Sequence, residues 1–234
     1  MINNDLLLEP WRARLRAHGR VQIPGFLQEP SALRLHQCLR EEVPWETAQR
    51  SDAVLADGQD RSPPPGSAAD EAALAATCLR ARAGFEFYFD RYRMIDARRD
   101  GTDPQLVLHA VVDFLNSPQF LDFARQLTGD PAIRMVSAIG VRYRAGHFLR
   151  AHNDLANDEN RAFAYVINLS RQWSPDWGGL LHFLDPEQRR VVDTFTPLWN
   201  SLSLFRVPQP HVVSLVAPWA GSARYSITGW FRRD

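Results

Sequence analysis

The stretch "IRMVSAIGVRYRAGHFLRAHND" (Ile133–Asp154) marks the point where the pattern of the chain changes. Before it, apolar residues recur mostly at helical spacing. After it, short apolar runs such as "FAYVINLS", "SLSLFRV" and "RYSITGWF" are separated by turn signals. The runs recur at roughly 8–12-residue intervals, which is typical of an antiparallel sandwich or jelly roll. Residues 133–234 therefore predict a double-stranded β-helix, that is, a jelly-roll core.

The first 132 residues predict helices interrupted by short strands. "VQIPGFL" (Val21–Leu27) favours a strand, and "PSALRLHQCLREE" favours a helix with Ser31 as its N-cap. An Ala-rich helix is expected over Asp70–Ala83. In "GFEFYFDRY" the phenylalanines alternate as on a strand with one apolar face. We expect one domain over residues 1–234, mainly β with N-terminal α, in which residues 1–132 buttress the jelly roll.

Two further helices are expected before the core. "PQLVLHAVVDFL" reads as a helix opened by Pro104. In "SPQFLDFARQLTG", Ser117 is the expected N-cap, Pro118 the first helical residue and Gly129 the terminator.

Composition restricts the class of protein. The 234 residues are 45% hydrophobic, which is enough for a sizeable core. Basic and acidic residues balance at 27 each, so no overall field favours nucleic acid or an anionic membrane. Cys38 and Cys78 lie in expected helices, and their spacing is not that of a metal site. This predicts reduced thiols and a cytoplasmic location. The absence of a long apolar run predicts a chain that neither spans a membrane nor carries a secretion signal.

A possible metal site lies at the end of the opening stretch. Residues i and i+2 of a strand share a face, so His152 and Asp154 would lie side by side while Asn153 points away. A lone His-x-Asp is more often a surface hydrogen-bonding pair. His211 opens the apolar run "HVVSLV" in the same sandwich and could supply a third ligand. Two histidines and one carboxylate leave three positions of an octahedral Fe(II) open.

A possible carboxylate anchor follows His211 in the chain. If the chain turns at Pro218–Trp219, a hairpin would place Arg224 opposite Val213, on the same face as His211. The Arg guanidinium binds a carboxylate bidentately. Ser226, at i+2, would share that face and could donate to the same carboxylate. Alternatively, Arg224 is a surface charge at the start of a strand.

Taken together, four spaced elements resemble the Fe(II)/2-oxoglutarate-dependent dioxygenases of the prolyl-hydroxylase type. These elements are His-x-Asp, "WSPDWGG", the distal His and the Arg-x-Ser strand. The likeness is strongest to the branch that acts on prolyl residues of a ribosomal protein. It covers residues 133–234, and more weakly "VQIPGFL" and the helix after it.

This resemblance implies roles for individual residues. His152, Asp154 and His211 would hold iron, and Arg224 would anchor the distal carboxylate of 2-oxoglutarate. Tyr143 matches a tyrosine that helps to hold this co-substrate. Where many relatives have a tyrosine in the next strand, the chain has Asn168, with Tyr165 three residues earlier, so either could be the contacting residue.

The resemblance also implies a reaction and cofactors. Fe(II), 2-oxoglutarate and O2 would hydroxylate a C–H bond and yield succinate, possibly with ascorbate. A prolyl residue in a protein is the leading substrate, and a free amino acid or another small molecule is the alternative. Nucleic-acid demethylation is disfavoured because Trp230 stands where those relatives have a second arginine. A jelly roll that has lost catalysis is the remaining alternative, and the oligomeric state is left open.

Residues that could contact the substrate are expected in three places. They are "GFEFYFDRY", Trp173 and the Ser51–Ala69 loop, which is either a lid or a plain surface linker. Gly178 and Gly179 are expected to shape a tight strand entry.

Overall fold

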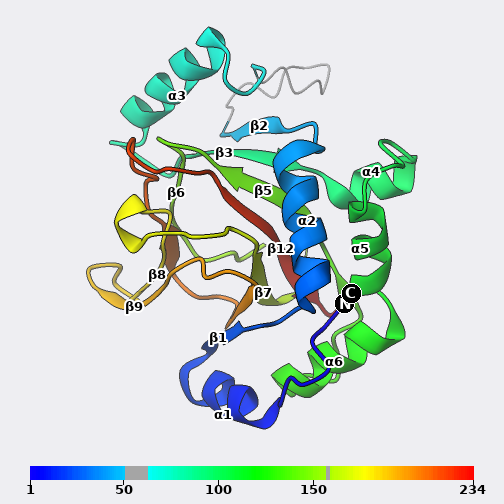
Figure 1. Ribbon diagram of the computed structural model, residues 1–234. Helices are drawn as coiled ribbons and strands as arrows, with labels where there is room; N and C mark the ends of the chain where they lie inside the picture. Colours follow the sequence, from blue (N-terminus) through cyan, green and yellow to red (C-terminus); the bar gives the residue numbers. More distant parts are fainter. Residues whose placement is uncertain (51–62, 157–158) are drawn as a thin grey trace.

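The computed structural model describes residues 1–50, 63–156 and 159–234. Its centre is a twelve-stranded antiparallel sheet that curls into a nearly closed barrel, with helices packed on one side (Figure 1). The strands are β1 (Arg20–Pro24), β2 (Glu46–Gln49), β3 (Phe87–Tyr92), β4 (Met135–Val136), β5 (Ile139–Tyr143), β6 (Phe148–His152), β7 (Arg161–Asn168), β8 (Leu181–Leu184), β9 (Val191–Phe195), β10 (Ser201–Arg206), β11 (His211–Val213) and β12 (Arg224–Arg232). The predicted jelly roll is confirmed.

The order of the strands explains the barrel. They run β1-β10-β7-β12-β5-β3-β6-β11-β8-β9, with β2 beside β3 and β4 beside β12. The two ends of this order, β1 and β9, meet through side chains. Arg20 Nε lies 2.8 Å from a carboxylate oxygen of Asp193, and Gln22 donates to the carbonyl of Thr196 over 2.8 Å. The barrel is therefore closed by side chains along one seam.

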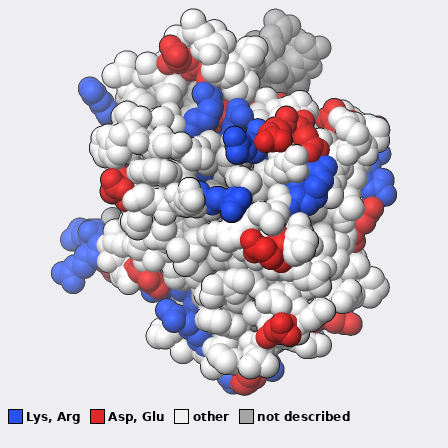
Figure 2. All heavy atoms as spheres, in the orientation of Figure 1, with Lys and Arg blue, Asp and Glu red and all other residues white. Residues whose placement is uncertain are grey.

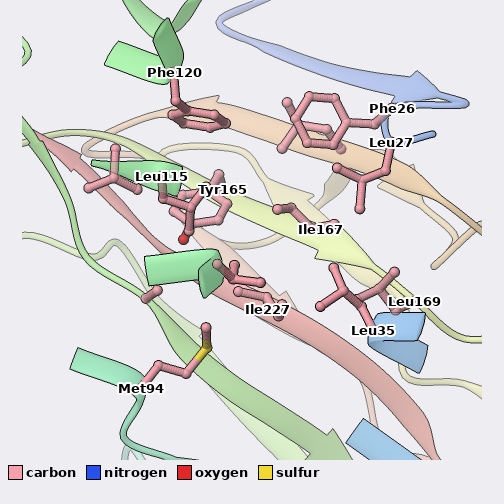
Figure 3. Packing of buried hydrophobic residues seen from close by; sticks show 14 of the residues in the cluster. Phe26, Leu27, Leu35, Met94, Leu115, Phe120, Tyr165, Ile167, Leu169 and Ile227 are labelled. Carbon is pink, nitrogen blue, oxygen red and sulfur yellow. The ribbon is translucent and has the colours of Figure 1, made fainter. Parts of the chain in front are cut away.

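The described helices are α1 (Glu9–His18), α2 (Glu29–Glu41), α3 (Ala68–Arg80), α4 (Met94–Asp100), α5 (Leu108–Leu115), α6 (Pro118–Thr128) and the 3-10 turn η1 (Pro175–Trp177). Side chains of α1, α2, α4, α5 and α6 pack on the outer face of the larger part of the sheet. Figure 3 shows Leu35 of α2 and Phe120 of α6 in the same buried layer as Ile167 and Ile227 of the sheet. Each fully buried side chain of this kind contributes roughly 1.5–3 kcal/mol. None of the described helices is long and apolar enough to cross a bilayer.

Several expected boundaries are wrong. Ser31 does not cap the helix, because α2 already begins at Glu29, with Pro30 in its first turn. Proline is favoured there because its missing N–H would be unpaired in any case. The helix expected from Pro104 begins only at Leu108, after turns. By contrast, the Ser117 cap is confirmed, since its hydroxyl accepts from the Phe120 N–H over 3.3 Å.

The N-terminal part does more than buttress the core. β1 pairs with β10, and β3 joins β5 to β6, so strands from both sides of residue 132 form the same sheet. β3 also shows the expected alternation, with Phe87 and Phe89 on the barrel side. Its other face carries Tyr88 and Asp90, which are fully buried. The sequence pattern did not show that this strand lies in the middle of the strand order, between β5 and β6.

Candidate functional site

The barrel encloses a cavity of about 440 Å³. Most of its lining is apolar, and the polar groups gather at two places. One is formed by His152, Asp154 and His211, and the other by Arg224 and Ser226. These residues come from β6, β11 and β12 and from the segment just after β6. All five residues predicted from the sequence as metal ligands or as a carboxylate anchor therefore face the same space.

The three candidate metal ligands converge closely. His152, the last residue of β6, is the cross-strand partner of His211, the first residue of β11. The Nε2 atoms of His152 and His211 lie 3.1 and 3.6 Å from the two carboxylate oxygens of Asp154. One ligand atom from each residue lies within 4.8 Å of the others. The sheet register thus brings together residues that are far apart in sequence.

Asp154 reaches this cluster differently from the prediction. β6 ends at His152, so Asp154 does not continue the strand, and its φ is 60°. Asp tolerates this left-handed conformation better than most residues do. The Asp154 carboxylate turns towards both histidines, and its backbone carbonyl accepts from Arg161 over 3.2 Å. A left-handed backbone conformation just after the strand end, rather than strand alternation, places the two ligands side by side.

Backbone carbonyl groups orient the two histidine rings through their Nδ1 atoms. Nδ1 of His152 lies 2.9 Å from the carbonyl of Arg150, and Nδ1 of His211 lies 2.7 Å from the carbonyl of Gln209. An Nδ1–H that donates to a carbonyl leaves the Nε2 lone pair free for a metal. Burial lowers the pKa of His211 to about 4, so its ring is neutral near pH 7. Two imidazole nitrogens and one carboxylate fit a divalent iron.

Arg224 lies at the far end of the cavity. It is the cross-strand partner of Tyr143 on β5, and its guanidinium carbon lies 5.3 Å from the centre of the phenol ring. Only 3% of the residue is exposed, and one guanidinium nitrogen donates to the carbonyl of Gly179 over 2.9 Å. Its Nε is buried and has no hydrogen-bond partner among the described residues. A buried cation with an unused donor suits an anionic ligand.

The hairpin expected to position Arg224 does not form. Val213 and the rest of β11 pair with β6 and β8, whereas β12 pairs with β4, β5 and β7. Arg224 reaches the cavity because β12 crosses the middle of the larger sheet. The expected face was correct, but the expected strand partner was wrong.

The choice between Asn168 and Tyr165 follows from strand alternation. Tyr165 points away from the cavity, into the layer under the helices, where its hydroxyl donates to the carbonyl of Ser137 over 2.9 Å. Asn168 lies on the barrel side, opposite Ser226, but does not line the main cavity. Its amide donates to the hydroxyls of Ser201 and Ser203 at 3.1 and 3.2 Å. Tyr165 is thus removed as a candidate contact.

An aromatic wall connects the two polar ends of the cavity. Phe85, Phe87 and Phe89 follow one another with ring centres 5.9 and 5.5 Å apart. Phe85 lies 5.8 Å from His152, and Phe89 stacks on Tyr143 at 5.3 Å. The expectation for "GFEFYFDRY" is confirmed as regards the cavity lining.

Other expected contacts lie elsewhere. Trp173 does not line this cavity, because its indole donates to the carbonyl of Gly178 over 3.0 Å behind it. Gly178 is structural as expected, since a Cβ there would lie 2.0 Å from the backbone oxygen of Leu215. Of the Ser51–Ala69 loop, residues 51–62 lie outside the described residues.

Sequence reasoning missed Arg161 as a residue of the cavity. Its guanidinium stacks on Trp230, 3.6 Å from the ring centre, and also contacts the backbone of Asp154. Both side chains line the cavity near the metal-ligand cluster. Arg161 opens an apolar strand, so no local sequence pattern distinguishes it from a surface charge.

Comparisons with known proteins agree with this geometry. Residues 139–232 match the family model described as the 2OG-Fe(II) oxygenase superfamily. A prolyl 3-hydroxylase, OGFOD1, from Mus musculus is 28% identical over 154 residues, and the one from Xenopus laevis is 30% identical over 121 residues. These matches cover 62% and 48% of this chain, but only 27% and 23% of those relatives. The matched part is about a quarter of each curated relative.

Solved structures share the fold. A 2OG-Fe(II) oxygenase family oxidoreductase from Burkholderia pseudomallei superposes with a TM-score of 0.64 at 18% identity, covering 100% of this chain and 94% of that one. A Trichoplax adhaerens prolyl hydroxylase in complex with a hypoxia inducible factor peptide fragment superposes with a TM-score of 0.57 at 19% identity, covering 95% of this chain and 87% of that one. At these identities the likeness concerns the fold alone.

Proposed function

We propose that this chain is a 2OG-Fe(II) oxygenase that hydroxylates a prolyl residue within a protein or peptide, since residues 139–232 match the model of that superfamily. The matched relatives named as prolyl 3-hydroxylases support this substrate class. The observation that carries the proposal is the charge of the cavity. Among the described lining residues, Asp154 is the only carboxylate, and it belongs to the metal-ligand cluster.

The charge of the lining discriminates between a free amino acid and a prolyl residue within a peptide. A free amino acid carries an ammonium group, which in an apolar cavity needs a carboxylate partner. The charged side chains here, other than the metal ligand, are the cations Arg161 and Arg224. A prolyl residue within a peptide has neutral amides in place of both charges. The ring of proline also fits the wall formed by Phe85, Phe87 and Phe89, because its apolar faces can pack on aromatic rings.

The reaction divides into what the cofactor supplies and what the chain does. Bound Fe(II), with 2-oxoglutarate and O2, supplies the oxidant for C–H hydroxylation. His152, Asp154 and His211 would hold the iron. Arg224 would pair with the distal carboxylate of 2-oxoglutarate, beside Tyr143 and Ser226. The aromatic wall would exclude water and orient the C–H bond towards the metal. No side chain needs to act as a general acid or base.

The test is turnover of 2-oxoglutarate by the iron-loaded protein. Peptides that contain proline are compared with the same peptides carrying alanine, and with free amino acids. We expect succinate formation coupled to a mass increase of about 16 Da, the mass of the inserted oxygen atom, only in the proline peptides. Coupled oxidation of a free amino acid, with no reaction of any peptide, would favour the small-molecule alternative.

Two expectations stay predictions. A requirement for ascorbate, which would return oxidised iron to Fe(II), can be measured as the number of turnovers with and without it. A cytoplasmic location agrees with the unpaired thiols of Cys38 and Cys78.

A further inference from the structure

A second cluster of charged and aromatic side chains lies on the outer face of the sheet, directly behind Arg224. Neighbouring residues of a strand point to opposite faces. Arg224 and Tyr143 point into the cavity, so Tyr225 and Arg142 point outwards. These two are cross-strand partners on β12 and β5. We call the cluster around them the outer patch. It consists of Tyr225, His36, Arg40, Arg142 and Arg171.

Aromatic rings form the floor and sides of the outer patch. The ring of His36, on α2, meets Tyr225 edge-on at 5.8 Å, and its Nδ1 lies 2.8 Å from the carbonyl of Leu169. Trp199 meets His36 edge-on at 5.8 Å, and Trp45 lies 6.5 Å from Tyr225. These ring contacts fix the four side chains relative to one another, and together they form the aromatic base of the outer patch.

Three arginines surround this base. Arg142 lies over Trp45, 5.1 Å from the ring centre, and Arg171 lies 5.7 Å from the centre of Trp199. The backbone of Arg171 lies beside β12, because the preceding residue, Ser170, accepts from the Tyr225 N–H over 2.8 Å. Arg40 follows His36 by one helical turn on α2, so the two share a face. In the space-filling view, blue side chains gather around a hollow in the upper middle of the face that carries α2 (Figure 2).

The charges of these arginines act on the same rings. Burial raises the pKa of Tyr225, and the positive charges of Arg142 and Arg40 oppose that rise. Burial lowers the pKa of His36, and Arg171 and Arg40 lower it further.

The negative charges nearby are fewer. Asp90 binds Arg142 over 2.7 Å, and Glu41 lies 4.0 Å from Arg40. In the described part of the chain, no carboxylate lies within 4.0 Å of the Arg171 guanidinium. The outer patch therefore has an excess of positive charge, although the chain as a whole is neutral.

We propose that the outer patch binds the phosphate group of a small phosphorylated molecule. The guanidinium groups of Arg142, Arg171 and Arg40 are spaced around the aromatic base, and together they offer more N–H donors than one planar carboxylate can accept. The three terminal oxygens of a phosphate monoester match them better. The aromatic sides would contact the organic part of the ligand. The outer patch would bind this group whether or not the chain hydroxylates proline.

Calorimetric titration with inorganic phosphate and with phenyl phosphate tests the proposal. The protein carries stoichiometric Mn(II) and excess 2-oxoglutarate, so that the ligands cannot compete for Arg224. We compare the wild type with the double variant Arg40→Gln/Arg171→Gln. Both side chains are exposed, so folding should survive, which a thermal melt verifies. We expect saturable binding that weakens at least about tenfold in the variant.

The matched control is Arg14→Gln/Arg189→Gln, which removes two exposed charges elsewhere. It should bind both ligands as the wild type does. The proposal is overturned if no saturable binding occurs, or if the two double variants lose affinity equally. A glutamate-rich peptide that binds more tightly than phenyl phosphate would also overturn it, and would assign the outer patch to an acidic peptide.

Discussion

Arg224 and Tyr143 face each other across two neighbouring strands and meet inside the barrel, with the guanidinium carbon 5.3 Å from the phenol ring centre. A register shift of one residue in β12 would turn Arg224 outwards. The register is held on both sides of β12, since Ser226 pairs with Val141 of β5 and with Asn168 of β7. The basic end of the cavity is therefore a product of sheet register.

Changing Arg224 should weaken co-substrate binding while leaving the metal in place. A buried bidentate contact contributes about 2–4 kcal/mol, so Arg224→Ala should raise the KM for 2-oxoglutarate roughly 30- to 700-fold. Arg224→Lys keeps the charge without the planar fork and should give an intermediate value. Mn(II) affinity should not change. If the KM rises less than about threefold in Arg224→Ala, another basic residue must be the anchor.

Each candidate metal ligand should be essential. His152→Ala, Asp154→Ala and His211→Ala should each weaken Mn(II) binding by more than about 100-fold, since losing even an outer-shell partner of a metal ligand costs about 10–100-fold. Electron paramagnetic resonance of free Mn(II) measures this without turnover. His182→Ala is the control, because His182 lies outside the cluster and contacts Thr194. Full activity of any of the three ligand variants would refute the assignment.

The aromatic wall should affect the substrate and not the co-substrate. Phe87→Ala removes roughly 1–2 kcal/mol of apolar contact, so the KM for a proline peptide should rise about 5- to 30-fold. The KM for 2-oxoglutarate should stay unchanged. Steady-state kinetics with each reactant varied in turn separates the two. Val192→Ala, an exposed change on β9, is the control. Equal effects on both KM values would indicate a general distortion of the barrel.

A buried ion cluster behind the wall should contribute to stability. Arg144 binds Asp70 at 2.7 Å and Asp90 at 2.8 Å, and both carboxylates are almost fully buried. Arg144→Met leaves them undercompensated and should lower the free energy of unfolding by about 2–4 kcal/mol in urea titrations. The control Arg98→Gln breaks only an exposed pair with Asp113, so little change is expected. Similar losses in both variants would contradict this account.

His147 should make stability depend on pH. It is fully buried, and burial lowers its pKa to about 4, against 6.5 in the unfolded chain. As the pH falls below about 6.5, the unfolded chain binds the proton first, so stability decreases towards pH 4. Between pH 7.5 and pH 5.0, protonation of this histidine in the unfolded chain should lower the free energy of unfolding by about 2 kcal/mol. Urea titrations of His147→Leu at both pH values should show a smaller decrease than the wild type, and an equal decrease would exclude His147.

How much of this could be read from the sequence depends on the range of the interaction. The alternation of apolar residues after Ile133 and the Ser117 cap are local signals, and both are confirmed. The grouping of His152 with His211 came from spacing and resemblance. The pairing of Arg224 with Tyr143 could not come from local signals, because β12 pairs with strands more than 50 residues earlier in the chain. The orientation of Asp154 depends on its left-handed backbone conformation, which sequence alternation does not encode.

The seam between β1 and β9 has a consequence for the width of the barrel. Paired strands keep a spacing of about 4.8 Å through their backbone hydrogen bonds. Across the seam the strands are joined by the Arg20–Asp193 ion pair, so no such fixed spacing applies. Phe205 and Leu181, which line the cavity, lie one strand in from the seam on either side. The width of the barrel can therefore adjust at the seam between β1 and β9 while every pair of hydrogen-bonded strands stays intact.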